Sequence, residues 1–213
     1  MNKERKHIRL RNFDYSSAGA YFITICTKDR ECFFGNIVGT QHVVTFSAIG
    51  KIANEYLNDI PNHFPHMEMD EFIVMPNHVH CILVLNEKSI GDDVGASHGM
   101  PLPNTDDNVG SHHVGTRHGV SLRDDNEIVR ASHVMPQQPI TNQFGKPVRG
   151  SVSVIINQFK SSVTRWCNKN NHQYFQWQSR FHDHVIRNEE EYNRIKNYII
   201  ANPMNWANDK FYK

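Results

Sequence analysis

The feature that most constrains this chain of 213 residues is a stretch, residues 86–147, whose composition cannot form a packed core. It holds 7 of the 12 Gly and 5 of the 9 Pro residues, and Phe144 is its one aromatic residue. A V-(G/R)-x-x-H theme recurs in it, beginning at Val94, Val109, Val114 and Val129. Sequence this polar cannot bury enough apolar surface to offset the entropy of the chain. We therefore expect a low-complexity repeat insertion at about 86–147, in a loop of one domain.

The length of the chain predicts a single domain, residues 1–213, with a basic N-terminal arm at 1–11. Lys and Arg number 23 against 22 Asp and Glu, so the net charge of +1 argues for neither nucleic acid nor membrane as a partner. The N-terminus lacks the apolar core of a signal peptide, and no apolar run approaches the ~18 residues of a membrane helix. The cysteines show no CxxC spacing, which supports neither a zinc ribbon nor a disulfide scaffold. We expect a cytoplasmic protein.

The block before the insertion predicts strands, one helix and a hairpin. Runs rich in aromatic, β-branched or apolar residues predict extended segments at 20–27, 32–35, 71–75 and 78–85. Apolar side chains recur at helical spacing over residues 46–59, which predicts a helix that Pro61 ends. Pro76 and Asn77 separate the last two extended runs, which indicates a hairpin more than one long strand.

The block after the insertion predicts helix, strand and helix. The same reasoning predicts helices at 151–169 and 188–201, with aromatic-rich extended pieces at 174–177 and 181–186. Asn188 can cap the last helix, with Glu191 three residues on in a capping-box arrangement, and Pro203 stops it. The complete order is typical of an α+β fold, in which helices pack on a face of one mostly antiparallel sheet.

Two histidines one residue apart, His78 and His80, interrupt an otherwise apolar run. Alternate side chains of a strand point to the same face, so the two imidazoles lie side by side and form half of a divalent-metal site. Two polar rings in a buried strand cost free energy unless each finds a partner. A second pair, His182 and His184, fits a polar strand end equally well, and we assign it no metal.

The run from Val74 to His80, followed by apolar residues, resembles the HUH motif (His, hydrophobic, His) of IS200/IS605-type single-strand transposases, especially the REP-associated tyrosine transposases. Residues 177–187 and 197–203 are similar to the WQxxFxxHxIR and YIxxNP signatures of that subfamily, in order and in spacing. The similarity spans about residues 9–85 and 148–206, and the insertion lies outside it. The resemblance implies the HUH, ferredoxin-like version of the α+β fold.

The resemblance also implies a catalytic quartet. The nucleophile of the family corresponds to Tyr198, and Asn202 matches the polar position that completes a metal site with His78 and His80. One helical turn separates Tyr198 from Asn202 on the flank of the apolar stripe. A carbonyl oxygen beside two imidazoles suits Mg²⁺ or Mn²⁺.

Simpler interpretations of these residues stay open. Asn202 can merely end the helix before Pro203. Tyr192 is a rival nucleophile, although its place on the apolar stripe favours packing.

The activity that the resemblance implies is transesterification on single-stranded, hairpin-forming (REP-like) DNA during transposition. Attack by the Tyr198 phenolate on phosphorus gives a 5′-phosphotyrosine and a free 3′-OH. Side chains proposed to contact the DNA are the basic arm and part of the WQxxF segment: Arg5, Lys6, Arg9, Arg11, Trp177, Arg180 and Phe181. The arm could equally be a solvated tail.

Two other classes of function compete with this one. A non-catalytic, domesticated relative could bind structured single-stranded DNA or RNA, although binding alone does not need all four residues of the quartet. A metal-dependent phosphodiesterase would cleave DNA with an activated water and form no protein–DNA linkage. The sequence leaves the choice between monomer and homodimer open.

Overall fold

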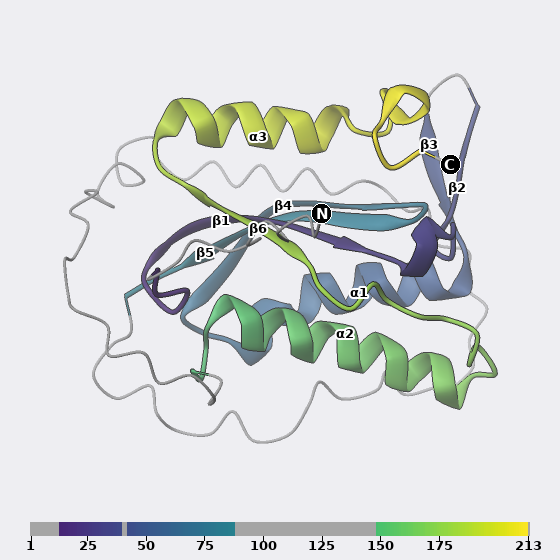
Figure 1. The fold of residues 1–213 in the computed structure, drawn as a ribbon, viewed down its shortest axis with the longest axis horizontal. Coiled ribbons are helices and arrows are strands. Elements are labelled where there is room, and N and C mark those ends of the chain that lie inside the picture. The colour runs from purple at the N-terminus through teal and green to yellow at the C-terminus, as the bar shows by residue number, and fades with distance from the viewer. Residues whose placement is uncertain (1–12, 40–41, 88–147, 213) are drawn as a thin grey trace, which may run out of the picture.

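A four-stranded antiparallel sheet forms the centre of the molecule (Figure 1). The computed structural model describes residues 13–39, 42–87 and 148–212, so the basic arm and most of the expected insertion lie outside the described residues. The strands follow the spatial order β4 (Met67–Met75), β5 (His78–Leu85), β1 (Gly19–Cys26) and β6 (His182–Ile186). The α+β prediction is confirmed, as is the hairpin between β4 and β5.

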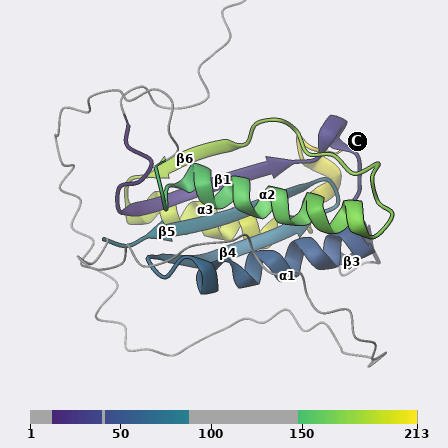
Figure 2. The same cartoon turned by 90° about the horizontal axis from the view of Figure 1, so that it is seen from below.

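The helices cover both faces of this sheet. Helices α1 (Ala48–His63) and α2 (Val152–Lys169) lie together on one face, and α3 (Glu189–Ala201) lies on the other (Figures 1 and 2). The sequence did not indicate this division. Within the described residues, no helix is long and apolar enough to cross a membrane.

Alternation along the central strands builds two apolar layers of different size. The odd-numbered Tyr21, Ile23 and Ile25 of β1 join the large core cluster that also contains buried residues of α1 and α2. The even-numbered Ile82 of β5 joins a small cluster with Ile195 and Ile199 of α3. Even-numbered residues of β5 therefore face α3, and His78 and His80 share that parity.

A short hairpin, β2 (Gly35–Val38) and β3 (Val43–Phe46), forms a separate two-stranded sheet. The extended segment predicted at 32–35 begins three residues late, because residues 33 and 34 lie in a turn. Gly35 has a φ of +139°, and a Cβ there would overlap the backbone of Thr45. Only glycine satisfies both conditions.

The prediction that Pro61 ends the first helix was wrong. Helix α1 begins after Ser47, whose hydroxyl accepts a hydrogen bond from the Gly50 N–H, and it continues through Pro61 to His63. Proline removes a helical donor, but the Phe64 N–H still reaches the Ile60 carbonyl at 3.2 Å and closes the last turn.

The extended piece predicted at 174–177 is not a strand. It makes a single antiparallel bridge, between Trp177 and Thr27, because Phe175 turns into the large core cluster. The other two helices and β6 agree with prediction to within a residue or two at each end, and Asn188 caps α3 as expected.

The two chain segments on either side of the expected insertion meet at one residue, His66. The N–H of Asn86 donates to the His66 carbonyl at 2.8 Å, and His66 Nε2 lies 3.0 Å from the carbonyl oxygen of Gly150. Both flanking segments therefore lie beside the last residue of β5, at the end of this strand opposite His78.

Candidate active site

Strand β5 presents His78 and His80 side by side on the face that α3 covers. Their ring centroids are 4.5 Å apart, and the residues are 0% and 1% exposed. The pairing predicted from the alternation of the strand is therefore present, in a fully buried setting.

The hydrogen bonds around His78 fix which ring nitrogen carries its proton. Asn77 donates its amide to two carbonyls, those of Arg30 at 3.0 Å and Phe211 at 2.8 Å, so its Oδ1 is left as an acceptor. His78 Nδ1 lies 2.9 Å from this oxygen and must donate to it. The lone pair of His78 is therefore on Nε2, and no hydrogen bond of ordinary geometry reaches that atom from the described residues.

His80 is held in a similar way. Its Nδ1 lies 2.9 Å from the hydroxyl of Thr24 on β1, and its Nε2 lies 3.3 Å from the hydroxyl of Tyr198 on α3. We assign Nδ1 as the donor to Thr24, which leaves Nε2 to accept from the phenol. Both imidazoles then direct an unprotonated Nε2 toward α3.

Burial keeps both rings neutral near pH 7. Burial, together with the charges of Lys210 and Arg30, lowers the pKa of His78 to about 3, while the Asn202 side chain acts in the opposite direction. Burial and then the neighbouring His78 hold the pKa of His80 well below its ordinary value. Neutral imidazole is the form that binds metal ions, so these histidines need not lose a proton first.

Helix α3 brings Tyr198 and Asn202 to the histidines. Ile195 and Ile199, which form the apolar stripe beside Tyr198 and Asn202, anchor the helix in the small apolar cluster. Tyr198 is 38% exposed, whereas Asn202 is 1% exposed. Asn202 donates its amide to Asp209 at 3.1 Å, and its buried Oδ1 has no hydrogen-bond partner among the described residues.

Three unengaged or weakly engaged atoms could bind a divalent cation: Nε2 of His78, Nε2 of His80 and Oδ1 of Asn202. Two of them, His78 Nε2 and Asn202 Oδ1, are buried acceptors that no donor among the described residues reaches, an arrangement that costs free energy unless something electropositive binds there. In the described parts of the chain, no three His, Cys, Asp or Glu side chains form a metal site, so a site here would need the amide oxygen. The amide oxygen is the ligand of the three that favours Mg²⁺ or Mn²⁺.

The Tyr198 phenol is protonated at neutral pH. Burial, followed by the charge of the Asp209 carboxylate, raises its pKa above the ordinary value. Its hydroxyl lies 3.4 Å from Asp209 Oδ2, in addition to the contact with His80. The rival Tyr192 packs against the small apolar cluster and hydrogen-bonds to Asp70, as the interpretation of packing expected.

Sequence reasoning missed the C-terminal segment that closes over the site. The ring centroid of Phe211 lies 4.5 Å from that of His78 and 5.8 Å from that of His80. The ring centroid of Trp206, in the short helix η3 (Trp206–Asn208), lies 6.0 Å from that of His78. Phe211 is 6% exposed. The segment has no strand or helix periodicity, so the sequence offered no signal beyond two isolated aromatic residues.

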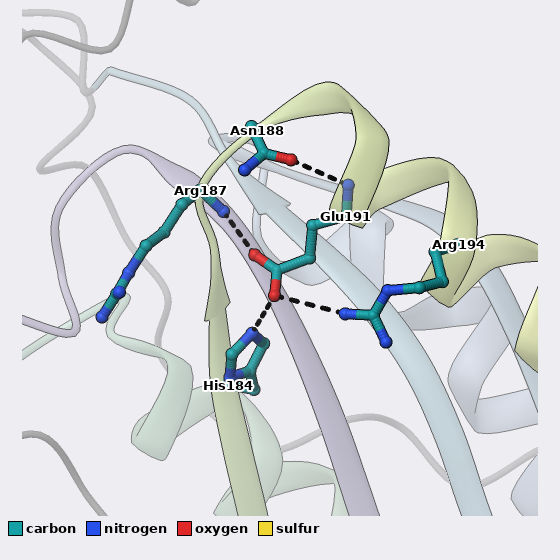
Figure 3. Close-up of polar contacts among 5 residues, drawn as sticks. All are labelled: His184, Arg187, Asn188, Glu191 and Arg194. Atoms are coloured by element: carbon teal, nitrogen blue, oxygen red, sulfur yellow. Dashed lines mark hydrogen bonds and ion pairs between the residues drawn. The ribbon is translucent and has the colours of Figure 1, made fainter.

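At the junction of β6 and α3, His184 of the second histidine pair has a structural partner (Figure 3). His184 Nε2 lies 2.8 Å from Glu191 Oε1, and Arg187 donates its N–H to the other oxygen of Glu191 at 3.0 Å. Glu191 in turn donates its N–H to the side chain of the cap residue, Asn188. In a standard capping box the Glu side chain accepts from the N–H of the cap residue, whereas here it accepts from the N–H of Arg187, one residue earlier. His184 thus ties β6 to the helix that bears Tyr198.

The side chains expected to contact DNA have three different locations: outside the described residues, on the surface, and in the core. Arg5, Lys6, Arg9 and Arg11 lie outside the described residues. Trp177 and two cations line an open hollow of about 620 Å³, whose lining is Lys28, Asp29, Arg30, Gln176, Trp177, Gln178 and Ser179. Arg180 is exposed, but Phe181 is 7% exposed and belongs to the large core cluster. Its ring packs the core and does not face solvent as a stacking platform would.

Comparison with solved structures returns transposases at low identity. One is described as the structure of the REP-associated tyrosine transposase bound to a REP hairpin, with 19% identity, a TM-score of 0.47, and coverage of 92% of this chain and 73% of that one. Another is described as "a putative transposase" from Deinococcus radiodurans R1, with 12% identity, a TM-score of 0.39, and coverage of 90% and 95%.

Comparison with curated proteins gives a relative along nearly the whole chain. No family model matches the sequence. A Haemophilus influenzae protein, described as an uncharacterized protein, is 32% identical over 208 residues, which cover 98% of this chain and 93% of the relative. The chain therefore belongs to the same family as this Haemophilus influenzae protein.

Proposed function

We propose that this protein is a Y1 HUH tyrosine transposase, a metal-dependent single-stranded DNA endonuclease and strand transferase. The observation that carries the proposal is the position of the Tyr198 hydroxyl, 3.3 Å from His80 Nε2, on the helical turn before Asn202, whose buried Oδ1 has no hydrogen-bond partner among the described residues. A phenol held beside a neutral imidazole, one turn before an amide oxygen that has no partner among the described residues, fits a reacting group better than a packing one.

Residues His78, His80 and Asn202 would hold Mg²⁺ or Mn²⁺. When bound, the cation would polarise the scissile phosphate and offset charge on its oxygens. The Tyr198 oxygen attacks phosphorus and the bond from phosphorus to the 3′ oxygen breaks. The phenol gives up its proton and the leaving 3′ oxygen gains one, so the products are a 5′-phosphotyrosine and a free 3′-OH. One phosphoester bond replaces another, so rejoining of the strand needs no ATP.

Single-stranded, hairpin-forming DNA is the proposed substrate. The WQxxF and YIxxNP signatures support this choice, because they resemble those of proteins that act on REP-like hairpins. Tyr198 also remains 38% exposed, so a phosphate can approach it from solvent. Lys28 and Arg30 in the hollow beside Trp177 offer cations for the strand backbone.

A denaturing gel tests the proposal. The full chain is incubated with Mn²⁺ and a labelled oligonucleotide that folds into a REP-like hairpin with single-stranded flanks. We expect a covalent protein–DNA adduct that disappears in Tyr198→Phe and persists in two control variants, Tyr192→Phe and Tyr212→Phe.

Each other outcome contradicts the proposal in a distinct way. An adduct that survives in Tyr198→Phe assigns the nucleophile to another residue. Metal-dependent cleavage without an adduct identifies a phosphodiesterase that uses water. A gel shift under native conditions with neither cleavage nor adduct identifies a non-catalytic binder.

A further inference from the structure

The carboxylate of Asp209 contacts both α3 residues of the proposed site. Its Oδ2 accepts from the amide of Asn202 at 3.1 Å and from the hydroxyl of Tyr198 at 3.4 Å. Its Oδ1 accepts from the Phe211 N–H at 2.7 Å, so a tight turn of the C-terminal segment fixes the direction of the carboxylate. Nothing in the family motifs quoted above includes this residue.

We propose that Asp209 is a positioning residue that fixes which atom of the Asn202 side chain faces His78; the inference rests on the proposed function. An amide can rotate by 180° and exchange its oxygen and nitrogen with almost no change in shape. Only the oxygen can bind a cation. A carboxylate accepts hydrogen bonds and cannot donate them, so Asp209 holds the Asn202 nitrogen outward. Oδ1 is then directed inward and buried, with no partner in the part of the chain that the structure describes.

Substitution by asparagine separates this role from a structural one. In Asp209→Asn, the new amide oxygen can still accept from the Phe211 N–H, so the turn is kept. Its nitrogen then faces the nitrogen of Asn202, and two donors cannot pair. Asn202 relieves the conflict by rotating, which turns its own nitrogen toward His78 and removes the oxygen ligand.

Substitution by alanine should be less harmful to metal binding than substitution by asparagine. In Asp209→Ala, nothing opposes Asn202, so its amide can still turn its oxygen to a cation. If Asp209 acted only through its charge or through the C-terminal turn, alanine would do at least as much damage as asparagine. The order of the two variants therefore distinguishes the mechanisms.

Mn²⁺ binding provides a readout that does not depend on catalysis. It is measured from the electron paramagnetic resonance signal of the free ion. With the full chain we expect Asp209→Asn to weaken Mn²⁺ binding about 10-fold or more, the range known for residues that orient metal ligands, and Asp209→Ala to weaken it less, by about threefold. Asp14→Asn is the matched control. Asp14 accepts from the N–H of Ser16 in the same type of turn, away from the site, and its loss should leave Mn²⁺ binding unchanged.

Exchanging the two residues provides a rescue. In the double variant Asn202→Asp with Asp209→Asn, the new carboxylate accepts from the new amide and still offers an oxygen to the cation. We expect Mn²⁺ affinity within about threefold of the unaltered protein. Failure of this rescue, or equal or weaker binding by Asp209→Ala relative to Asp209→Asn, would overturn the inference.

The same variants separate this inference from the proposed function. If the unaltered protein binds Mn²⁺ but forms no adduct, the proposed function fails and the order of the Asp209 variants still decides the inference. If Asp209→Asn binds Mn²⁺ and forms adduct like the unaltered protein, only the inference fails. If the unaltered protein binds no Mn²⁺, both fail.

Discussion

The hydroxyl of Tyr198 lies 3.3 Å from Nε2 of His80, although 118 positions separate the two residues in the chain. One belongs to the last helix and the other to the central strand β5, and the small apolar cluster beneath α3 fixes their approach. The distance between the Tyr198 hydroxyl and the His80 ring therefore depends on how α3 packs against the sheet, and this dependence can be tested.

Replacing Thr24 with valine should weaken metal binding by way of His80. The exchange keeps the shape of the side chain but leaves His80 Nδ1 without its partner at 2.9 Å. Residues that orient a ligating histidine typically contribute 10–100-fold in affinity, so we expect at least a ~10-fold rise in the Kd for Mn²⁺. Thr45→Val, on the separate hairpin, should leave the Kd unchanged. An unaltered Kd in Thr24→Val would argue against the assigned role of the hydroxyl.

Ile82→Ala should loosen α3 selectively. Ile82 is buried on the face toward α3, and its truncation should cost about 2–5 kcal/mol of stability. Leu83→Ala removes a side chain of similar size from the opposite face of the same strand. Hydrogen exchange should speed up most in α3 for the first variant and most in α1 and α2 for the second. The same pattern in both variants would contradict the division into two layers.

Glu191 should stabilise the protein only above acidic pH. The hydrogen bonds from the Arg187 N–H and from His184 hold the pKa of Glu191 below its ordinary value. A carboxyl whose pKa is lower in the folded state stabilises above its unfolded pKa of about 4.3, and this contribution disappears as the pH falls through the folded value.

Glu191→Gln should therefore lower the melting temperature at pH 7, with a loss of about 0.5–1 kcal/mol. The difference from the unaltered protein should shrink between pH 5 and pH 3, as followed by circular dichroism. Glu190→Gln, an exposed neighbour in the same helical turn, should show a smaller difference at pH 7. A difference for Glu191→Gln that stays constant down to pH 3 would show that the charge is not involved.

Gly50→Ala should destabilise the protein although alanine is the better helix former. A Cβ at this position would overlap the backbone carbonyl of Phe34, which cannot move as a flexible side chain could. We expect a net loss of about 1–3 kcal/mol in urea unfolding. Asn58→Ala, at an exposed position of the same helix, should change stability little or increase it.

Local periodicity was sufficient to predict the parts of the site that lie on one element. His78 and His80 share a face because a strand alternates, and Tyr198 and Asn202 share a flank because four residues make about one helical turn. The sequence could not show that α3 covers the face of the sheet opposite α1. That choice depends on contacts between Ile82 and Ile199, which are distant in the chain, and periodicity contains no information about such pairs.

The errors in the predicted elements have similar causes. Pro61 was expected to end α1, but one lost donor near the end of a helix is tolerated when a later N–H, here that of Phe64, completes the last turn. Residues 174–177 look like a strand because they are aromatic, yet Phe175 packs into the core in place of pairing. Asp209 escaped notice because an isolated acidic residue in an aperiodic segment has no signature until its neighbours in space are known.

The meeting of both flanking chain ends at His66 has a consequence for how this fold can change. Asn86 and Gly150 are both held by His66, one by its backbone carbonyl and the other by its ring, so the distance to be bridged between them is short whatever the number of residues in between. The entropy of closing such a loop grows only with the logarithm of its length. A lineage could lengthen, shorten or exchange the sequence at this point at small cost, because the phenol and the imidazoles stand at the other end of β5. We therefore expect this position to tolerate an inserted sequence, and an engineer could use it as an attachment point.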